Sequence, residues 1–558
     1  MVSSQRVDAL NNPARALLDL FTEKTPLDLD TFPTAVANHF SEIFASDDAF
    51  QEIPALDIDH PPSKYDDNAL VRFRAMIQDT SPSPELYLAK YNSGQCGGWG
   101  LSKDAQTDDS SSAEVDDVDS VIEYADLREC AVVWAVSIPG ESAWCRDGNS
   151  ISDSTENKGQ NSASTSQSHK FPIPDAKHVG VRLKIYDGNL AQSLKSTDTH
   201  SFVGILSSES LNTDRYSDTD TDKEVPTLHV LFSRPLTSTI VPRKFPYTLP
   251  KDSQTTSVLD LRNELITWIA DEGLAGDRDA AEWVLLCVLS RVQSRTPPIL
   301  PPSLNISRFP PPSTLSKDST SPAPEPILPT LLSYILPTVT SVPLSLNTIN
   351  TTDFYPQSKD EDLHAGWLQL ASGSTMCLWE GGLSEGGVNE KGIMNLRAIQ
   401  EIMNGQAVDY VFPFSKFSFP TDIVCITISE GRKSTFFQTS INVPLKPSSK
   451  EAEIVQRLYQ APDRLKVPHA DKLEMFRGLI GGAKIGKVTI NDNVAEHIQE
   501  DFVKERQTGG GDQAVTSEDL VHRIMTARLL ALSYQSEEVT IDIWERTKAL
   551  EASRKARF

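Results

Sequence analysis

The run that most resembles a chemical motif is Gly481 to Val488, GGAKIGKV, near the end of the chain. It satisfies the GxxxxGK spacing of a phosphate-binding P-loop, but Val488 stands where a P-loop has the Ser or Thr hydroxyl that binds magnesium. A P-loop also follows a buried strand and opens a helix, so that its amides face the phosphates. Here helical periodicity precedes the run, and Gly481-Gly482 is expected to end that helix. We therefore interpret the run as a glycine-rich turn between two helices.

A second candidate, Met376 to Glu380, is an apolar strand that ends in an acid. The pattern is similar to a Walker B strand, in which an Asp holds magnesium and a Glu orients the attacking water. Trp379 occupies the Asp position, and Glu380 alone cannot hold the metal, so we interpret Glu380 as a structural acid. The run Glu430-Gly431-Arg432 is open to two interpretations, a phosphate-facing loop or a plain turn, and the turn is favoured.

No other pattern in the sequence indicates catalysis or metal binding. The ten His residues include no pair at i, i+4. The six cysteines are far apart, whereas a structural zinc site needs clustered ligands. Cys287, Cys377 and Cys425 lie in apolar runs, where buried free thiols are expected. The sequence thus predicts no catalytic residue, no cofactor-binding residue and no metal site.

Four aromatic residues could stack on the bases of a single strand: Tyr87, Tyr91, Trp134 and Trp144. A strand-binding groove needs positive charge, however, and this chain of 558 residues has a formal net charge of −25 and a pI of about 4.8. An acidic surface repels phosphate backbones. We therefore favour packing roles for these rings, and a protein rather than a nucleic acid or a small molecule as the partner.

Composition indicates several domains and some disorder. Only 39% of the residues are apolar, which is below the usual share in globular chains. No apolar run approaches the length of a membrane span, and the N-terminus lacks a signal-peptide pattern, so we expect a cytosolic or nuclear chain. The basic residues Arg554, Lys555 and Arg557 are too few to form more than a weak import or interaction signal.

A strand opens the ordered part of the N-terminal half. Apolar and polar residues alternate through 71–78, which predicts one buried face. Two prolines end this strand, and 86–91 is expected to return against it as a hairpin. Arg72, Arg74 and Gln78 on the polar face are candidates for partner contact, although a solvated barrel face is an equal alternative.

Further short strands indicate a small β-domain over 63–240, preceded by an N-terminal helical region, 1–62, with two apolar packing stripes. The strands are expected at 121–128, 130–138, 179–186, 202–206 and 227–232. Such strands fit an OB-type β-barrel best, with a small sandwich as the alternative. Low-complexity stretches are interpreted as disordered insertions at about 100–119, 148–170 and 212–224.

The remainder is predicted to be an α/β domain over 255–450 and a helical domain over 451–558. In the α/β domain we expect helices at 259–270, 279–292 and 395–403 and strands at 376–379, 408–412 and 423–428. The Pro-rich stretch 296–329 is interpreted as a loop or an insertion. In the helical domain, helices are expected at 470–480, from 491 or 492 to 506, after Thr516 and after Thr540.

Short segments in order along nearly the whole chain resemble one known family, the mini-chromosome maintenance (MCM) complex-binding proteins. The clearest is 71–79 (VRFRAMIQD) with 85–87 (ELY) and Tyr91. The others are 138–144 (IPGESAW), 202–207 (FVGILS), 280–289 (AAEWVLLCVL), 429–432 (SEGR), 501–503 (DFV), 527–533 (ARLLALS) and 544–550. The low-complexity insertions fall outside these segments.

The resemblance implies a multidomain α+β architecture similar to that of the MCM helicase subunits. Its parts are an N-terminal helical region, an OB-type β-barrel with disordered insertions and a degenerate AAA+-like α/β domain with a C-terminal helical lid. No glycine-rich loop precedes the helix at Asp279, Trp379 replaces the metal-binding Asp, and Glu518 aligns where a lid arginine would contact nucleotide. The resemblance therefore implies a chain that does not hydrolyse ATP.

For function, the resemblance implies a non-enzymatic partner of the MCM helicase subunits. Such a protein assists the assembly, stability or remodelling of the MCM complex in DNA replication and acts in the nucleus, with a cytoplasmic pool as a further option. The alternative is an OB-fold replication factor that binds single-stranded DNA. Neither requires a cofactor or a membrane.

Overall fold

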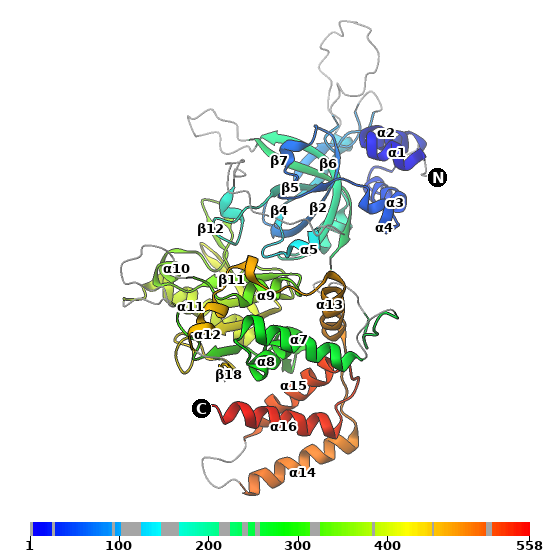
Figure 1. The fold of residues 1–558 in the computed structure, drawn as a ribbon. Coiled ribbons are helices and arrows are strands. Elements are labelled where there is room, and N and C mark those ends of the chain that lie inside the picture. The colour runs from blue at the N-terminus through cyan, green and yellow to red at the C-terminus, as the bar shows by residue number, and fades with distance from the viewer. Residues whose placement is uncertain are drawn as a thin grey trace, which may run out of the picture.

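The computed structural model describes residues 4–24, 28–91, 95–101, 124–146, 167–210, 224–236, 244–251, 257–312, 324–381, 386–448, 451–508 and 516–558. The molecule is elongated (Figure 1). N-terminal helices and a β-barrel lie at one end, a parallel sheet with its helices lies in the middle, and a group of helices with the C-terminus lies at the other end. The protein is therefore mixed α/β.

Four N-terminal helices pack on the barrel: α1 (Ser4–Asn11), α2 (Pro13–Glu23), α3 (Phe32–Ile43) and α4 (Asp47–Gln51). The Asn12 side chain caps the start of α2. The apolar stripes predicted in these helices, which include Leu17 and Phe40, are buried in one core with Trp99 and Phe232 of the barrel. The helical region thus shares its core with the barrel.

Five strands form the barrel: β2 (Leu70–Asp79), β4 (Leu127–Ser137), β5 (Gly180–Ile185), β6 (Thr199–Ser210) and β7 (Glu224–Pro235). Pairing runs β2–β4–β5–β7–β6 and returns to β2, so the sheet closes on itself. Within this ring β5 and β7 are parallel and the other pairs are antiparallel. The short elements beside it are β1 (Ala55–Leu56), η1 (Pro62–Lys64), β3 (Glu85–Leu88), η3 (Tyr124–Asp126), α5 (Ala143–Arg146) and α6 (Gly188–Ser193). Phe73 and Phe202 are buried inside.

The predicted hairpin between β2 and β3 is wrong. β3 pairs with the first part of β4, whereas β2 pairs with the second part of β4 and with β6. β4 has 11 residues, so it is long enough to pair with both neighbours. β2 is also covered on both faces, because Gln78 and Asp79 are buried and Arg72 and Arg74 are half-buried. The prediction of one solvated face is therefore wrong as well.

The predicted insertions lie mostly outside the described residues, at 102–119, 148–166 and 212–223. The predicted C-terminal ends of the second and third insertions, at 170 and 224, are wrong. Residues 168–170 form a 3-10 turn, η4 (Ser168–Lys170), in which Lys170 is buried, and Glu224 already belongs to β7. In the described part, the strands predicted at 121–128 and 130–138 are one strand, β4.

A five-stranded parallel sheet forms the middle of the molecule, in the order β11–β14–β17–β10–β18. The strands are β10 (Leu304–Ser307), β11 (Val339–Pro343), β14 (Ser374–Trp379), β17 (Ile423–Ile428) and β18 (Ile441–Pro444). Every residue of β14 and β17 is buried, as expected for strands covered on both faces. Both strands were predicted from their apolar runs.

The interpretation of 296–329 as a loop or an insertion is wrong in part. This stretch contains β10, which lies between β17 and β18 in the sheet. Only Leu304 and Ile306 are apolar in this four-residue strand, and the buried Asn305 is hydrogen-bonded to Ser429 beyond the neighbouring strand. The pattern is too short and too polar to be recognised by periodicity. Residues 313–323 lie outside the described part.

Helices flank the parallel sheet: α7 (Val258–Gly273), α8 (Arg278–Leu289), α9 (Leu328–Ser333), α10 (Leu346–Thr351), α11 (Glu390–Gly405) and α12 (Glu451–Leu458). The predicted helices at 259–270, 279–292 and 395–403 correspond to α7, α8 and α11. A second sheet has the order β13–β12–β15–β16, from β12 (Gln357–Lys359), β13 (Asp362–His364), β15 (Ala407–Phe412) and β16 (Ser415–Pro420). A small hairpin joins β8 (Ser294–Arg295) to β9 (Pro298–Ile299).

The C-terminal helices are α13 (Ala470–Ile485), α14 (Asp492–Thr508), α15 (Ser517–Ser533) and α16 (Ile541–Lys555), with η5 (Pro462–Arg464) before them. Thr516 and Asp519 form a capping box at the start of α15, which confirms the predicted start. The predicted break at Gly481-Gly482 is wrong. A Cβ on Gly482 would lie 2.5 Å from the Lys244 carbonyl oxygen, so this glycine serves close packing within a continuous helix.

The barrel is fastened to the edge of the parallel sheet. The Val339 amide donates to the Gly140 carbonyl, and the Ser142 amide donates to the Pro337 carbonyl, both at 2.8 Å. The chain after β4 therefore runs beside the edge strand β11 and covers its open side. Covered edges resist pairing with foreign strands.

Candidate functional site

Ligands of parallel α/β sheets bind beyond the carboxyl ends of the strands, so this edge is the first place to look for chemistry. Here three aromatic rings lie against one another at that edge. The ring centroid of Trp379, at the end of β14, is 5.7 Å from that of Phe309 and 5.8 Å from that of Tyr459. The Tyr459 hydroxyl donates to the Pro310 carbonyl at 2.8 Å, and Trp379 and Phe309 are 2% and 1% exposed. Packed rings thus take up the space beyond these strand ends.

Glu380, the acid after β14, is held by the protein itself. Its carboxylate accepts from the Ser434 hydroxyl at 2.5 Å and from the Thr435 amide at 2.8 Å. Burial raises the pKa of Glu380, although these hydrogen bonds oppose the rise. The arrangement fits the structural acid inferred from the sequence.

The P-loop-like run lies in α13 and not on a loop after a strand. Residues 481–485 belong to the helix, and Gly486 is its C-cap. The backbone amides of the helix interior are engaged within the helix, so they do not face a ligand. Lys484 is buried, and its Nζ reaches the Gly373 carbonyl at 3.4 Å. Burial lowers the pKa of this ammonium group. This geometry does not fit a phosphate cradle.

The Glu430-Gly431-Arg432 run is a plain turn after β17, which was the favoured interpretation. The Gly431 carbonyl accepts from the Arg308 amide at 2.8 Å, and the Arg432 carbonyl accepts from the Asn442 side chain at 2.9 Å. The turn therefore holds the segments that follow β10 and enter β18.

The barrel aromatics make contacts within the chain, as favoured above, but only Trp134 is buried. Tyr87, Tyr91 and Trp144 are half-buried, and the Tyr91 hydroxyl donates to the Leu101 carbonyl at 3.3 Å. The Tyr87 ring contacts Tyr186 edge-on at 4.8 Å, and Trp134 is 6% exposed. Trp144 donates from Nε1 to the Ser333 carbonyl at 2.8 Å, with the Arg477 guanidinium 4.0 Å from its ring centroid. Trp144 thus joins the barrel to the sheet domain and remains half-exposed.

The polar residues of β2 make contacts within the chain. Arg72 donates from Nε to the Ile53 carbonyl at 2.8 Å, and Arg74 pairs with Glu141. Arg72 and Arg74 therefore connect β2 to neighbouring segments of the same chain, and their side chains are already engaged there.

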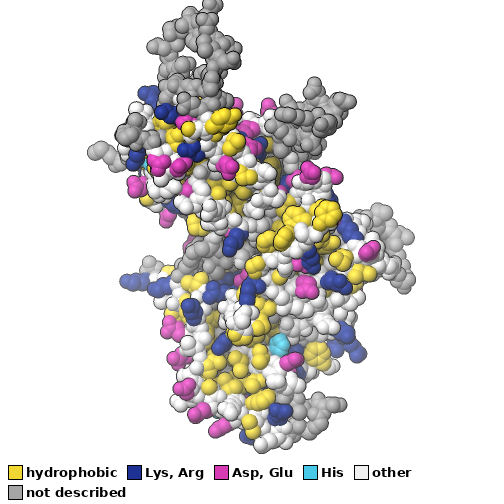
Figure 2. Space-filling model, turned by 180° about the vertical axis from the view of Figure 1, so that it is seen from behind, with side chains coloured by type: hydrophobic (Ala, Val, Ile, Leu, Met, Phe, Trp, Pro, Cys, Tyr) yellow, Lys and Arg dark blue, Asp and Glu magenta, His cyan; other side chains and the backbone are white. Residues whose placement is uncertain are grey.

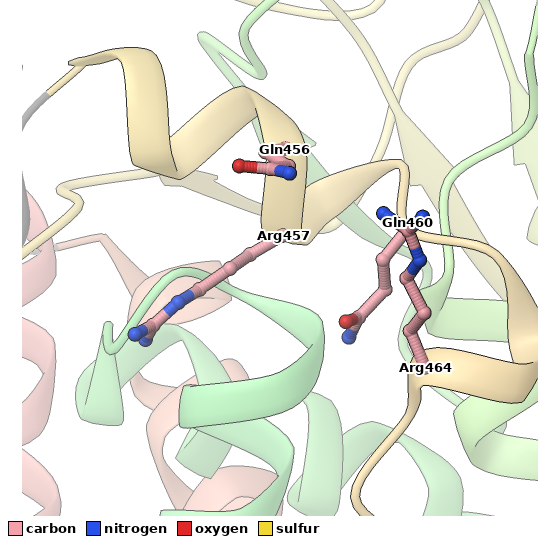
Figure 3. A pocket seen from close by; sticks show the side chains of 4 residues that line it. All are labelled: Gln456, Arg457, Gln460 and Arg464. Carbon is pink, nitrogen blue, oxygen red and sulfur yellow. The ribbon is translucent and has the colours of Figure 1, made fainter.

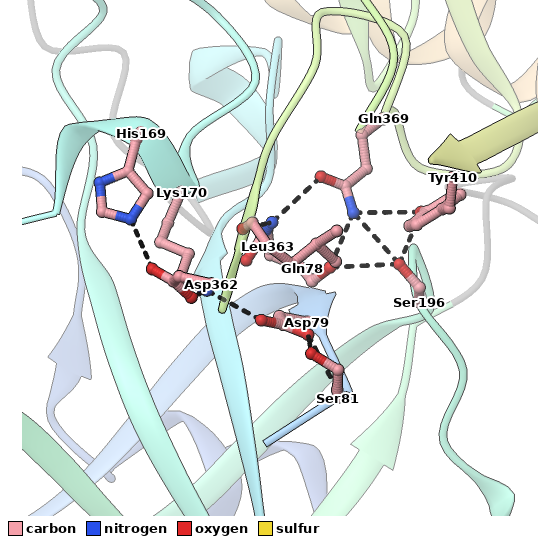
Figure 4. Close-up of polar contacts among 10 residues, drawn as sticks. All are labelled: Gln78, Asp79, Ser81, His169, Lys170, Ser196, Asp362, Leu363, Gln369 and Tyr410. Carbon is pink, nitrogen blue, oxygen red and sulfur yellow. Dashed lines mark hydrogen bonds and ion pairs between the residues drawn. The ribbon is translucent and has the colours of Figure 1, made fainter. Parts of the chain in front are cut away.

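A buried polar network joins the barrel to the sheet domain (Figure 4). Gln369 donates from Nε2 to the Gln78 carbonyl at 2.7 Å and to the Tyr410 hydroxyl at 3.0 Å. Gln78 in turn donates to the Leu363 carbonyl at 3.2 Å, and Ser196 lies 2.6 Å from the Tyr410 hydroxyl. Burial raises the pKa of Tyr410 to about 12. Gln78 Oε1 is the one buried atom of these side chains that accepts no hydrogen bond in the described part of the chain. The remaining hydrogen bonds hold the two domains in a fixed relative position.

An ionic contact lies beside this network. Lys170, 3% exposed, donates from Nζ to Asp79 Oδ2 at 2.8 Å and also pairs with Asp362 of β13 (Figure 4). Asp79 is itself buried. The contact spans residues that are 192 apart in the sequence, which explains why periodicity could not reveal it.

A surface hollow of about 280 Å³ is lined by Gln456, Arg457, Gln460 and Arg464 (Figure 3). In this view Gln460 and Arg464 lie close together, whereas the Arg457 side chain extends away from them. Gln460 donates to the Glu272 carbonyl at 3.3 Å. Guanidinium and amide groups can contact an anion, but the diverging side chains do not converge on one point.

The hairpin of β15 and the edge strand β16 carries three exposed phenylalanine rings. Phe414 in the β15–β16 turn is 102% exposed, and Phe417 and Phe419 of β16 are 53% and 41% exposed. All six residues of β16 are exposed. Exposed apolar surface of this kind marks contact sites with other proteins.

The face drawn in Figure 2 carries interspersed acidic and basic side chains together with several groups of hydrophobic side chains. No continuous basic groove is visible on this face. It therefore offers the kind of surface that suits a protein partner better than a nucleic acid.

Two of the three basic residues considered as a weak signal at the C-terminus, Arg554 and Arg557, form ion pairs within the fold, whereas Lys555 is exposed. Arg557 pairs with Asp277 at 2.6 Å, and Arg554 pairs with Glu551 at 3.0 Å. Glu518 is exposed in the first turn of α15. Among the described residues, none of the helices combines the length and apolar character that crossing a membrane requires.

A family model described as mini-chromosome maintenance replisome factor matches residues 40–170 and 147–558. The chain is also similar to curated proteins named mini-chromosome maintenance complex-binding protein. The relative from Danio rerio is 26% identical, and the alignment covers 99% of this chain and 97% of the relative. The relative from Arabidopsis thaliana is 25% identical, with 99% of each chain covered, and that from Gallus gallus is 24% identical, with 99% and 98% covered.

Proposed function

The chain belongs to the family of mini-chromosome maintenance complex-binding proteins, and from this we propose that it is a non-enzymatic partner of MCM helicase subunits. In this proposal it assists the assembly, stability or remodelling of the MCM complex in DNA replication. The match over 99% of the chain is the observation that carries the proposal.

The strand pairing supports an OB-type assignment for the barrel. Around the barrel the strands follow in the order β2, β4, β5, β7 and β6. In chain order these are the first, second, third, fifth and fourth strands, and the parallel pair, β5 with β7, is the third with the fifth. The OB fold is a five-stranded Greek-key barrel, so the strand number and closure support this assignment. The helical N-terminal region shares a core with it.

The parallel sheet supports the assignment of a degenerate AAA+-like domain. The first strand along the chain, β10, lies between the fourth, β17, and the fifth, β18. On the other side of β17 come β14, the third strand, and then β11, the second. This order places the first strand inside the sheet, next to the edge strand β18. In a P-loop unit the phosphate loop follows such an internal strand. In this chain Phe309 follows β10 and Trp379 ends β14. Helices α13–α16 would form the lid.

The proposed mechanism is mimicry. A chain with the same succession of domains as an MCM subunit can take a neighbour's place beside that subunit without supplying catalytic groups. The aromatic rings at the carboxyl edge of the sheet support this, because they leave the shape of the domain intact while occupying the place of a nucleotide. If this is correct, ATP turnover by the purified chain stays at background, and Glu380→Gln changes nothing. Turnover that disappears in that variant would contradict it.

We place the partner contact on the β15–β16 hairpin, defined by Phe414, Phe417 and Phe419. These exposed rings would be covered by an apolar surface of an MCM subunit, which is the usual fate of such a surface in a functional complex. Capture of MCM subunits by the tagged full chain tests the function. Two truncations, lacking 1–250 or 250–558, test the mimicry. Equal binding by both truncations and by the whole chain would argue against it.

The competing function is binding of single-stranded DNA by the barrel. The net charge of −25 and the packing of Tyr87, Trp134 and Trp144 against other parts of the chain argue against it. Titration of a labelled oligonucleotide at moderate salt separates the two, because sub-micromolar binding would favour the DNA-binding function. A nuclear location belongs to the proposed function and is tested by imaging a fluorescent fusion of the chain.

A further inference from the structure

Two imidazoles and a carboxylate come together where the barrel meets the sheet domain. His169 Nε2 lies 2.7 Å from Asp362 Oδ2, and the rings of His169 and His364 are 4.3 Å apart between centroids, tilted by 34°. One ligand atom from each of the three residues lies within 4.8 Å of the other two. All three side chains are half-buried, so the cluster is open to solvent on one side.

The backbone fixes the positions of these three residues. Asp362 and His364 are two apart in β13, so their side chains leave the same face of the strand. Asp360 and Glu361, in the turn between β12 and β13, have φ of 50° and 63°, as a tight hairpin turn requires. The Ala365 amide donates to the His169 carbonyl at 2.8 Å, which holds the third residue against β13.

We propose that His169, Asp362 and His364 form a binding site for one zinc ion or a similar divalent transition metal. Imidazole nitrogen and carboxylate oxygen are the ligands that such ions take, and three protein ligands with a water in the fourth position is an ordinary coordination for zinc. This site is independent of the proposed function. It joins two domains, so a bound ion would strengthen the joint beside the network of Gln78 and Gln369.

The neighbouring groups suit this role. Lys170 donates to Asp362 Oδ1, which orients the carboxylate and leaves Oδ2 towards the two imidazoles. The metal would replace the hydrogen bond between His169 and Asp362. Tetrahedral Zn–N distances of about 2.0–2.1 Å imply a spacing of roughly 3.3–3.5 Å between ligand atoms. The His169 and Asp362 atoms would have to separate from 2.7 Å, and the His364 nitrogen, within 4.8 Å of both, would have to adjust to the same spacing. Small rotations of the half-exposed rings suffice.

Hydrogen bonding alone is the simpler explanation of the cluster, and the chain contains a matched control for it. His60 Nδ1 lies 3.0 Å from Asp57 Oδ1, so this pair reproduces the His–Asp contact. No second imidazole appears with it in a metal-ligand group among the described residues. A metal ion that requires all three ligands will bind at His169, Asp362 and His364 and not at the His60–Asp57 pair.

The experiment is a zinc titration by calorimetry of the untagged full chain after treatment with a chelator, beside His169→Ala, His364→Gln and His60→Ala. We expect one ion per chain in the original protein and in His60→Ala, and at least a tenfold weaker affinity in the other two variants. Cobalt(II) provides a second readout, since its visible absorption reports tetrahedral coordination by these ligands. Folding is checked for each variant by circular dichroism.

Hydrogen exchange gives a readout that does not depend on affinity. Zinc should slow exchange in residues 167–170 and 357–365 of the original protein and leave it unchanged in His364→Gln. The proposal is overturned if the original protein binds no zinc, or if His169→Ala and His364→Gln bind it as tightly as His60→Ala does.

Discussion

Trp379 and Phe309 meet edge to face, with ring centroids 5.7 Å apart and planes at 70°, beyond the carboxyl ends of β14 and β10. In a nucleotide-binding sheet this is the space for phosphates and a metal. Both rings are nearly fully buried, and a Cβ on Gly381 would lie 1.7 Å from the Trp379 ring. The tight fit indicates that the rings have become part of the core of the domain.

Removing the Trp379 ring should therefore destabilise the sheet domain. For Trp379→Ala we expect a loss of about 3–5 kcal/mol in the free energy of unfolding, the usual cost of a cavity left by a large buried aromatic residue. Chemical denaturation followed by circular dichroism measures it. Tyr124→Ala, which truncates a ring that is 89% exposed, is the control and should cost under about 0.5 kcal/mol. Equal stability of the two variants would show that the rings are not core.

A charge introduced into the barrel interior should unfold the barrel. Phe73 is 0% exposed within the barrel interior, and an unpaired charge there would cost several kcal/mol. We expect Phe73→Asp to unfold the barrel, seen as loss of protease resistance in residues 70–235, whereas Phe73→Leu should remain folded. A soluble, protease-resistant Phe73→Asp protein would contradict the position of Phe73 in β2.

Periodicity was a good guide where an element is long or fully apolar. The helices α8 and α15 and the strands β14 and β17 were found this way, and Thr516 was recognised as a cap because its side chain serves a local need. Helix α13 was cut short at Gly481 because a glycine can either end a helix or allow close packing. The sequence pattern does not distinguish a glycine that ends a helix from one that allows close packing.

Contacts between residues that are far apart in the chain could not be predicted from the sequence. Strand β10 has only Leu304 and Ile306 as apolar residues, and its buried Asn305 is satisfied by a residue 124 positions away. The pairing of β3 with β4 instead of β2 likewise depends on tertiary structure. The candidate metal cluster joins residues separated by 193 positions, and no spacing rule could link His169 to Asp362. Periodicity predicted a β-domain, an α/β domain and a helical domain, and the resemblance to a family added the expectation of an AAA+-like domain with a lid.

Acid should weaken the barrel through Glu209. Burial opposes ionisation of this carboxyl, but hydrogen bonds from His229 and from Lys184, at 2.6 Å, outweigh it and lower the pKa from 4.5 to about 2. Because the pKa is lower in the folded state, the stabilisation is complete above pH 4.5 and is lost as the pH falls towards 2.

Glu209→Gln should therefore reduce stability at pH 7 by about 1–3 kcal/mol and change it little at pH 2, with partial exposure limiting the size. Urea denaturation of the barrel at both pH values measures this. Glu401→Gln, at an exposed position, is the control and should have no effect at either pH. A loss of the same size at pH 2 and pH 7 would contradict the assigned ionic contact.

The exposed hairpin gives a test at the surface. Phe417 and Phe419 are 53% and 41% exposed on the edge strand β16, so replacing both by Ser should leave the melting temperature within about 2 °C. The double variant should retain less than a tenth of the MCM subunits captured by the original chain. Val521→Ser, at a position that is 56% exposed on α15, is the matched control and should capture as much as the original. Normal capture by the double variant would exclude the hairpin as the contact.

The central claim is that this chain binds MCM subunits and does no chemistry of its own. The most direct measurement mixes the purified full chain with purified MCM subunits, singly and together, and determines mass by size exclusion with light scattering, with and without ATP. We predict a stoichiometric complex with at least one subunit, formed equally well without ATP. The absence of a complex with any subunit or mixture would contradict the claim.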